Sequence, residues 1–178
     1  MEEMLKATLS FARDEYASEP SRDVDLLSLL QSLSDDYQER GEAVRLLAEG
    51  KLVYTCRPAL IRRAMQNLLD NALRYAGNAV EVAASLAGDC SAPYVVISVL
   101  DRGPGIAAEE MGEIFNPFIR GDRARGGKGT GLGLAIVKRI ASLHGGSVEL
   151  RNRAGGGMEA RVCLPLGLLL PRDAACAL

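Results

Sequence analysis

The sequence predicts an α+β fold, a two-layer sandwich in which helices cover one face of a mixed, mostly antiparallel sheet. Three observations support this fold class. Helical and strand patterns are mixed along the chain, hairpins dominate among the strands, and 178 residues with 48% hydrophobic residues suffice for one full core. No internal repeat or low-complexity segment suggests another architecture.

The first 40 residues are predicted to be mainly helical. Residues 2–18 carry enough apolar positions for a helix that packs on the domain or on a partner helix, and Pro20 ends that segment. Asp25 is placed to cap a second helix over residues 26–40, where leucines recur at helical spacing.

The remaining elements are indicated by alternating apolar residues, by glycine and by proline. Two further helices are expected, over residues 58–76 and 132–144, because proline begins the first and glycine follows both. Strands are expected over residues 44–47, 52–56, 80–86, 94–100, 147–152 and 158–164. The last four strands form two hairpins, and the long connection between the hairpins, residues 101–131, is typical of a functional or mobile loop.

Composition excludes several classes of function. The net charge of −2 gives no global attraction to nucleic acid or to an anionic membrane, so no nucleic-acid partner is expected. Four scattered cysteines and one histidine make a zinc site improbable, and reduced thiols are expected. No apolar run approaches the roughly 20 residues that span a bilayer.

A polar stripe runs along the predicted helix 58–76, opposite its apolar arc. Asn67 and Asn71 are four residues apart, so they are neighbours on this stripe, and Arg74 follows one turn later. Carboxamide oxygens can bind a hard cation such as Mg²⁺ without adding negative charge, which suits a metal carried by an anionic triphosphate. An ordinary solvated helix face is also consistent with this pattern.

A carboxylate follows the predicted strand 94–100. Asp101 precedes Arg-Gly-Pro-Gly, and a carboxylate held in a glycine turn can accept a hydrogen bond from a ligand N–H, such as an adenine amino group. Gly103 and Gly105 permit close approach and unusual backbone angles. A plain strand-ending turn uses the same residue types, so both interpretations remain open.

A glycine-rich run from Gly126 to Gly133 precedes the predicted helix 132–144. Backbone N–H groups at a helix N-terminus bind phosphate, and the helix dipole adds to this. The run is neither a P-loop nor a dinucleotide-binding fingerprint, and a surface loop with solvated charge is the alternative. Basic residues that can close over phosphates lie in or just before it: Arg120, Arg123, Arg125 and Lys128.

Together and in this order, these segments resemble the sequence boxes of the ATP-binding domain of bacterial sensor histidine kinases. The wider superfamily includes DNA gyrase, heat-shock protein 90 and MutL. The N, G1, F and G2 boxes correspond to residues 67–75, 101–105, 115–118 and 129–134. The resemblance covers residues 20–165 and is greatest to the EnvZ-type branch. It implies a Bergerat-type sandwich that binds ATP between the N-box helix and a lid.

The resemblance also implies roles for individual residues. Asn71, assisted by Asn67, is expected to ligate Mg²⁺, and Asp101 to hold the adenine amino group. Arg120 is expected to act beside the phosphates as a third catalytic residue with the two asparagines, and Phe115 and Phe118 to anchor the lid. The residues expected to bind the nucleotide are Asn71, Ala72, Leu73, Arg74, Tyr75, Asp101, Gly103, Gly105, Ile106, Phe118, Arg120, Gly121, Thr130, Gly131, Leu132, Gly133 and Leu134.

Asn67 favours one reaction within this superfamily. The hydrolysing members carry a glutamate at the first N-box position, where it activates water, whereas an amide accepts no proton at neutral pH. The resemblance therefore implies transfer of the ATP γ-phosphate to a histidine rather than hydrolysis. The only histidine, His144, falls at the end of a predicted helix, where a donor suits the helix dipole, so the acceptor is expected on another segment.

These expectations describe the catalytic part of a protein-histidine kinase that lacks its phosphoacceptor. Residues 1–19 are expected to be a remnant of a dimerisation helix, 20–165 the ATP-binding domain, and 166–178 a C-terminal tail. The implied partners are a histidine-bearing dimerisation domain of the same homodimeric protein and a response regulator. The implied location is cytoplasmic, in an inner-membrane sensor. The alternatives are a stand-alone ATPase or protein-serine kinase of the superfamily, and a degenerate ATP-binding docking module.

Overall fold

The computed structural model describes residues 19–76, 79–89, 92–118 and 131–166, so the predicted helix over residues 2–18 and the tail from residue 167 lie outside the described residues. The elements, in order, are β1 (Arg22–Asp25), α2 (Leu26–Glu39), β2 (Val44–Leu46), β3 (Val53–Cys56), α3 (Pro58–Ala76), β4 (Val80–Ala87), β5 (Tyr94–Leu100), α4 (Ala108–Met111), α5 (Gly133–Leu143), β6 (Ser147–Asn152) and β7 (Met158–Pro165).

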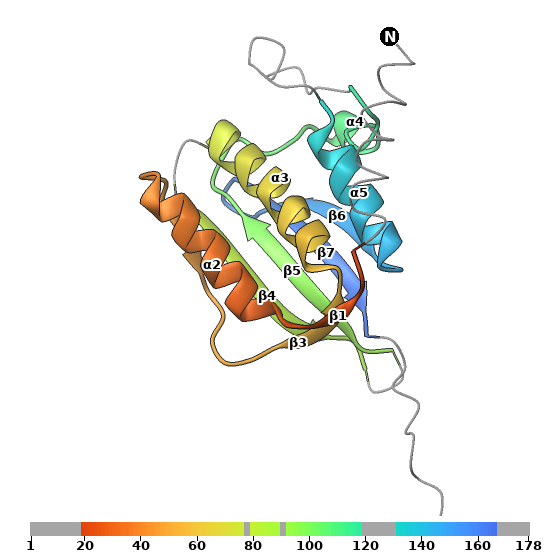
Figure 1. The fold of residues 1–178 in the computed structure, drawn as a ribbon. Helices are drawn as coiled ribbons and strands as arrows, with labels where there is room; N and C mark the ends of the chain where they lie inside the picture. The colour runs from red at the N-terminus through yellow and green to blue at the C-terminus, as the bar shows by residue number, and fades with distance from the viewer. Residues whose placement is uncertain (1–18, 77–78, 90–91, 119–130, 167–178) are drawn as a thin grey trace, which may run out of the picture.

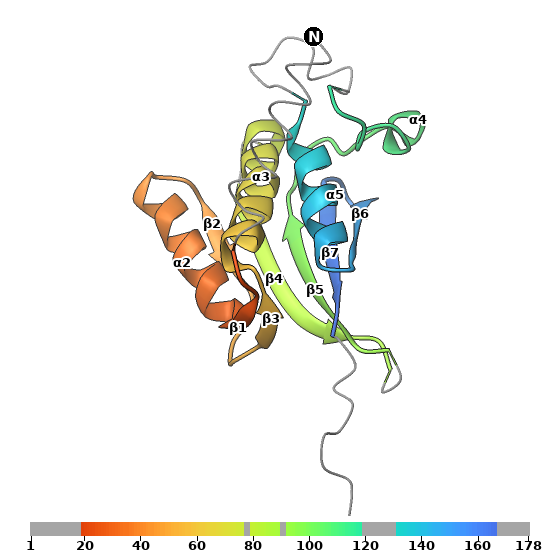
Figure 2. The same cartoon turned by 45° about the vertical axis from the view of Figure 1, so that its right-hand side comes forward.

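Five strands form the main sheet, in the order β2-β4-β5-β7-β6. The β2–β4 pair is parallel and the other three pairs are antiparallel. Helices α2, α3 and α5 lie on one face of this sheet (Figure 1), and the turned view shows the same layering (Figure 2). The predicted α+β two-layer sandwich with a mixed, mostly antiparallel sheet is confirmed.

One part of the strand prediction is corrected. The strand at Val53–Cys56 does not join the main sheet but pairs antiparallel with β1, a strand that the sequence did not predict. Only Val24 is apolar in β1, so four residues of mostly polar character give no alternating signal. The short helix α4 was also not predicted, because four residues are too few for a periodic pattern.

Asp25 caps α2, as predicted. Its Oδ1 atom accepts hydrogen bonds from the backbone N–H of Leu27 at 3.2 Å and of Leu52 at 3.1 Å, and its Oδ2 accepts from the Ser28 hydroxyl. The bond from Leu52, followed by that from Ser28, lowers the pKa of Asp25 below its usual value. One carboxylate therefore joins the start of α2 to the segment that leads into β3.

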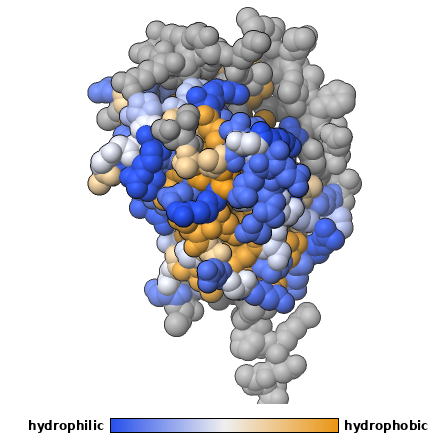
Figure 3. All heavy atoms as spheres, turned by 90° about the vertical axis from the view of Figure 1, so that its left-hand side faces the viewer, coloured by the Kyte–Doolittle hydropathy of each residue, from blue (hydrophilic) through white to orange (hydrophobic). Residues whose placement is uncertain are grey.

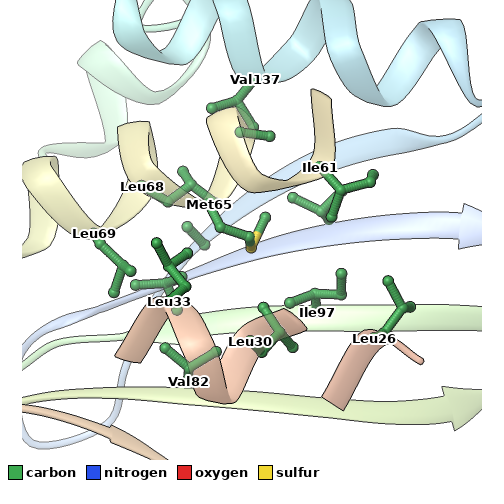
Figure 4. Close-up of a cluster of buried hydrophobic side chains, with 14 of the residues drawn as sticks. Leu26, Leu30, Leu33, Ile61, Met65, Leu68, Leu69, Val82, Ile97 and Val137 are labelled. Atoms are coloured by element: carbon green, nitrogen blue, oxygen red, sulfur yellow. The ribbon is translucent and has the colours of Figure 1, made fainter. Parts of the chain in front are cut away.

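The core lies between the helices and the sheet. Figure 4 shows leucines of α2 and apolar side chains of α3 meeting above β4 and β5, with Val137 of α5 closing the layer. The predicted apolar arc of α3 is confirmed, since each of its members is at most 4% exposed: Ile61, Met65, Leu68, Leu69 and Ala72. Burial of this arc fixes the rotation of α3 about its axis and turns the opposite stripe, with Asn67 and Asn71, away from the core.

Cys56 belongs to this core. Burial, and to a smaller extent the Glu19 carboxylate, raises the pKa of the Cys56 thiol to about 11. Cys56 and Cys163 are both free, and neither is bonded to the other. Cys56 is thus a protonated, unreactive core residue at neutral pH.

One edge of the sheet carries apolar surface. β2 pairs only with Val80–Val82, so the second half of β4 has no strand neighbour on that side among the described residues. Leu86 at the end of β4 is 61% exposed. Figure 3 views the molecule from the side of α2 and shows an apolar area bordered by hydrophilic side chains.

None of the described helices is sufficiently long and apolar to cross a membrane.

A hydrogen bond joins α2 to the polar side of α3. The Tyr37 hydroxyl donates to Asp70 Oδ1 at 2.6 Å, and the tyrosine ring is buried beneath Arg40. Burial, followed by the bond to the Asp70 carboxylate, raises the pKa of Tyr37 well above its usual value, so the hydroxyl remains a donor through the neutral range. Asp70 lies between the two asparagines in sequence, so this bond supports the helix where they project.

Tyr37→Phe is expected to lower the free energy of unfolding by about 1 kcal/mol, because it removes a hydrogen bond whose acceptor lies at the surface and can be hydrated instead. Urea unfolding of Tyr37→Phe, Asp70→Ala and the double variant measures this. The two losses should not add, because each single change removes the same bond. Strictly additive losses would contradict the pairing.

Candidate functional site

The two asparagines of the polar stripe face the start of α5. A Cβ atom built on Gly133, the first residue of α5, would lie 3.2 Å from Asn67 Oδ1 and 3.4 Å from Asn71 Nδ2. The Asn67 amide nitrogen donates to the Arg63 carbonyl oxygen at 2.8 Å, which leaves Oδ1 directed toward α5. The structure therefore brings together the N-box and G2-box residues that lie more than 60 positions apart in sequence.

The start of α5 has no side-chain cap. Its N-cap residue is Leu132, whose side chain makes no capping hydrogen bond, and the first turn contains no acidic residue. The first N–H groups of a helix have no partner within the helix, and the helix dipole makes this end electropositive. Gly133 presents these groups without a Cβ, and Leu134 follows, packed partly against the core. An anionic group fits at this end of α5.

Asp101 is buried at the end of β5. Asp101 is only 5% exposed, and its Oδ1 accepts hydrogen bonds from the backbone N–H of Gly103 at 2.8 Å and of Met158 at 3.1 Å. Both bonds use the same oxygen. Among the described residues this leaves Oδ2 as the oxygen available to a ligand donor, and the role in holding an amino group stays a prediction.

The Asp101 turn packs on the C-terminal end of α3. A Cβ on Gly103 would lie 3.2 Å from Ala76 Cα and 3.3 Å from the Tyr75 carbonyl oxygen. Tyr75 follows Asn71 by one helical turn, about 6 Å along the axis. Tyr75 is 45% exposed and Arg74 is exposed, so both side chains are available beside the site. Asn71, Tyr75 and Asp101 thus occupy neighbouring positions at one end of the sandwich.

The F-box segment, residues 115–118, contacts both Gly131 and helix α5. The backbone N–H of Phe118 donates to the Gly131 carbonyl oxygen at 3.0 Å, and the Lys138 ammonium of α5 lies 5.7 Å from the centre of the Phe115 ring. Phe118 has a positive φ of 66° and is 50% exposed. These contacts bring residues 118 and 131 side by side at the base of the predicted lid.

Some predicted site residues do not face this site or cannot be placed. Ala72 is a core residue and Leu73 packs partly against the core, so neither side chain projects from the polar stripe. Arg120, Gly121 and Thr130 lie outside the described residues, as do Arg123, Arg125 and Lys128. Within the described ranges no group of three or more His, Cys, Asp or Glu side chains could hold a metal ion, so the two carboxamides remain the candidate metal ligands.

His144 is the C-cap residue of α5, at the end of the predicted helix. Its Nδ1 donates to the Ile140 carbonyl oxygen at 2.8 Å, and its Nε2 accepts the backbone N–H of Arg57 at 3.2 Å, just before α3 begins. Both ring nitrogens are used, which makes His144 a link between the far ends of α5 and α3 rather than an exposed phosphoacceptor.

His144→Ala is expected to lower the free energy of unfolding by about 1–3 kcal/mol, because the Arg57 N–H loses its acceptor. Ser142→Ala is the matched control, since the Ser142 hydroxyl is exposed and bonds only within its own helix. Urea unfolding compares the two. Equal midpoints for His144→Ala and the wild-type chain would show that the link contributes nothing.

The hairpin turn between β6 and β7 also belongs to the site, although the sequence pattern does not predict this. Asn152 bonds to the backbone of Ile106, Arg153 donates to the Asp101 carbonyl oxygen at 2.8 Å, and Gly157 leaves no room for a Cβ against Asp101. The glycines at 155–157 fall between the predicted strands 147–152 and 158–164, where the sequence predicts a hairpin turn. A hairpin turn requires glycine at one or two positions, so a run of three glycines is the sequence signal that this turn packs closely against another segment.

Several known proteins are similar to this chain. The model of the family described as "Histidine kinase-, DNA gyrase B-, and HSP90-like ATPase" matches residues 56–168. The chain is 36% identical over 169 residues to sensor histidine kinase GtrS of Pseudomonas aeruginosa, covering 94% of the chain and 34% of that relative. It is 38% identical to sensor histidine kinase component HK1 of Mycobacterium tuberculosis, covering 70% of the chain and 72% of that relative. A "Probable sensor histidine kinase HK" of Mycobacterium tuberculosis is covered over 41% of its length, so the chain spans well under half of two of these relatives.

Solved structures give the same result for the fold. The ATP binding domain of PrrB from Mycobacterium tuberculosis superposes with a TM-score of 0.65 at 29% identity, covering 82% of this chain and 96% of that one. The histidine kinase domain of the Escherichia coli osmosensor EnvZ superposes with a TM-score of 0.63 at 34% identity, covering 89% and 96%.

Proposed function

Because the chain belongs to the family of histidine kinase-, DNA gyrase B- and HSP90-like ATPases, and within it to the sensor histidine kinases, we propose that it binds Mg²⁺·ATP and transfers the γ-phosphate to a histidine on a separate dimerisation domain. One observation carries the proposal. Two asparagines, the uncapped start of α5 and the buried Asp101 lie along the middle and C-terminal end of α3.

Each part of this arrangement has a proposed role. Asp101 Oδ2 accepts a hydrogen bond from the adenine amino group, and the free N–H groups at the start of α5 bind phosphate. Asn71, assisted by Asn67, would hold Mg²⁺ through carboxamide oxygens, and the ion would supply neutralisation of the charge on the transferring phosphoryl group. Ile106, Tyr75 and Arg74 contact the nucleoside and phosphates at the rim of the site.

Asn67 favours transfer over hydrolysis. Its amide nitrogen donates to the Arg63 carbonyl oxygen and its oxygen faces Gly133, so the side chain offers no group that takes a proton from water. Catalysis then consists of positioning and charge neutralisation, in which the chain's residues hold the γ-phosphate for an incoming imidazole. Arg120, with Gly121 and Thr130, is proposed to complete the phosphate contacts.

The proposed partners follow from the same family membership. They are a histidine-bearing dimerisation domain of the same full-length, homodimeric protein, to which residues 1–19 would connect, and a response regulator that receives the phosphate. The proposed location is the cytoplasmic side of an inner-membrane sensor, with the ATP-binding domain over residues 20–165.

Phosphotransfer to a supplied domain tests the proposal. The chain is mixed with labelled ATP, Mg²⁺ and a separately made histidine-bearing dimerisation domain, and acid-labile label should appear on that domain. His144→Ala should give the same product, since this histidine is not the acceptor. Steady phosphate release by the chain alone would instead support an ATPase, and nucleotide binding without transfer would support a docking module. A wild-type chain that binds neither ATP nor ADP with Mg²⁺ at millimolar levels would falsify the proposal.

A further inference from the structure

The turn between β6 and β7 lies directly against the segment that runs from Asp101 to Ile106. Strand pairing sets Asn152 opposite Met158, and the turn between them closes with a hydrogen bond from Arg153 N to the Gly157 carbonyl oxygen at 2.9 Å. Gly155, Gly156 and Gly157 all have positive φ, which lets the chain fold tightly over Asp101. The two segments are about 50 residues apart in sequence, so their contact is purely tertiary.

Asn152 makes the most specific of these contacts. Its Oδ1 accepts the Ile106 backbone N–H at 2.9 Å, and its Nδ2 donates to the Ile106 carbonyl oxygen at 2.7 Å. A single carboxamide thereby satisfies both backbone groups of one residue, as a neighbouring strand would. Gly105, with φ of 73°, brings the chain against the Asn152 side chain, where a Cβ would meet Asn152 Oδ1.

The rest of the turn holds the other end of the same segment. Met158 forms two hydrogen bonds with Asp101. The Asp101 backbone N–H donates to the Met158 carbonyl oxygen at 2.9 Å, and the Met158 backbone N–H donates to the side-chain Oδ1 of Asp101 at 3.1 Å. Arg153 donates to the Asp101 carbonyl oxygen. Asp101 is therefore held by the strand pair, whereas Ile106 is held by the Asn152 side chain alone among the bonds described for it.

We propose that Asn152 is a positioning residue for base recognition, which it performs by fixing Gly105 and Ile106 at the distance from Asp101 that admits an adenine ring. This inference rests on the proposed nucleotide site. Asn152 itself touches neither base nor phosphate in this scheme. Without the two bonds from Asn152, Ile106 is no longer held, whereas Asp101 keeps its bonds to Met158 and Arg153. One side of the base site is then lost, and the phosphate contacts at the start of α5 remain.

Titration calorimetry with ADP and GDP in the presence of Mg²⁺ tests the inference on the whole chain. Asn152→Ala is expected to weaken ADP binding by about tenfold, the effect of losing one to two hydrogen bonds that position a contact. GDP binding should change little, so the preference for adenine falls by a similar factor. Arg151→Ala is the matched control, because Arg151 is the preceding residue of β6 and pairs with Glu149 away from the turn. Its ADP affinity should stay within about twofold of wild type.

A second variant keeps the test decisive if Asn152→Ala does not fold. Asn152→Asp retains the acceptor for the Ile106 N–H but cannot donate to the Ile106 carbonyl oxygen, so it should lose part of the adenine preference. An unchanged ratio of ADP to GDP affinity in a folded Asn152 variant, with folding confirmed by urea unfolding, overturns the inference alone. Absence of ADP binding by the wild-type chain overturns the proposed function instead.

Discussion

Asp101→Asn is expected to weaken ATP binding by about 10–100-fold with little loss of stability. The substitution keeps an Oδ1 acceptor for the Gly103 and Met158 N–H groups and replaces Oδ2 with an NH₂ group. That group presents a donor to the adenine amino group and removes a charged acceptor, whose hydrogen bond is worth roughly 1.5–3 kcal/mol. Calorimetry with ATP and GTP measures the change, and the preference for ATP should disappear.

Asp101→Ala tests a different property of the same residue. Alanine leaves the N–H groups of Gly103 and Met158 without their side-chain acceptor in a buried turn, at a cost of about 1–3 kcal/mol for each donor. Urea unfolding should therefore separate the two variants, with Asp101→Ala clearly less stable than Asp101→Asn. If Asp101→Asn bound ATP and GTP as the wild-type chain does, the assignment of Asp101 to adenine recognition would be wrong.

Asn71→Ala is expected to remove most of the dependence of nucleotide affinity on Mg²⁺. Changes in the outer shell of metal sites cost about 10–100-fold in metal affinity, so loss of a direct ligand should cost at least about tenfold. Helix stability should not suffer, because alanine is the better helix former and Asn71 belongs to the polar stripe. Calorimetry with ATP at several Mg²⁺ concentrations, and in EDTA, gives the measurement.

Two further variants define the metal assignment. Gln31→Ala is the control, because Gln31 is an exposed carboxamide of α2 that bonds only to Asp35. Gly133→Ala places a methyl group 3.2 Å from Asn67 Oδ1, so the Asn67 side chain must shift, and brings it into contact with Asn71 Nδ2 at 3.4 Å. It should weaken Mg²⁺-dependent binding in the same direction as Asn71→Ala. Wild-type Mg²⁺ dependence in Asn71→Ala would exclude this residue as a ligand.

The sequence predicted the helices and strands that have strong local signals. The apolar arc of α3, the Asp25 cap and the two hairpins all appear at or near the expected residues, because periodicity, capping and turn chemistry depend on neighbours along the chain. β1 was missed for the complementary reason. Its four residues are mostly polar, and pairing with β3, not composition, makes them a strand.

The candidate site was predicted by residue type but not by arrangement. Asn67, Asn71, Asp101 and Gly133 are predicted from their sequence context, and in the structure they lie along the middle and C-terminal end of α3. For Asn152 the sequence predicts only the end of a strand. Its two bonds to Ile106 join residues 46 positions apart, and no local pattern reports a contact of that kind.

By itself, the sequence determined the chemical groups that the site can offer. These are two amides rather than a carboxylate on the polar stripe of α3, the Asp101 carboxylate in a glycine turn, and glycines before a helix. Only the tertiary structure decided how they are held. Packing of the β6–β7 hairpin allows Asn152 to bond to Ile106. Packing of α3 against α5 places Gly133 next to the two asparagines and lets both ring nitrogens of His144 bond to backbone groups. The physical reason is that residue type sets which bonds a side chain can form, whereas packing of distant segments selects which of them form.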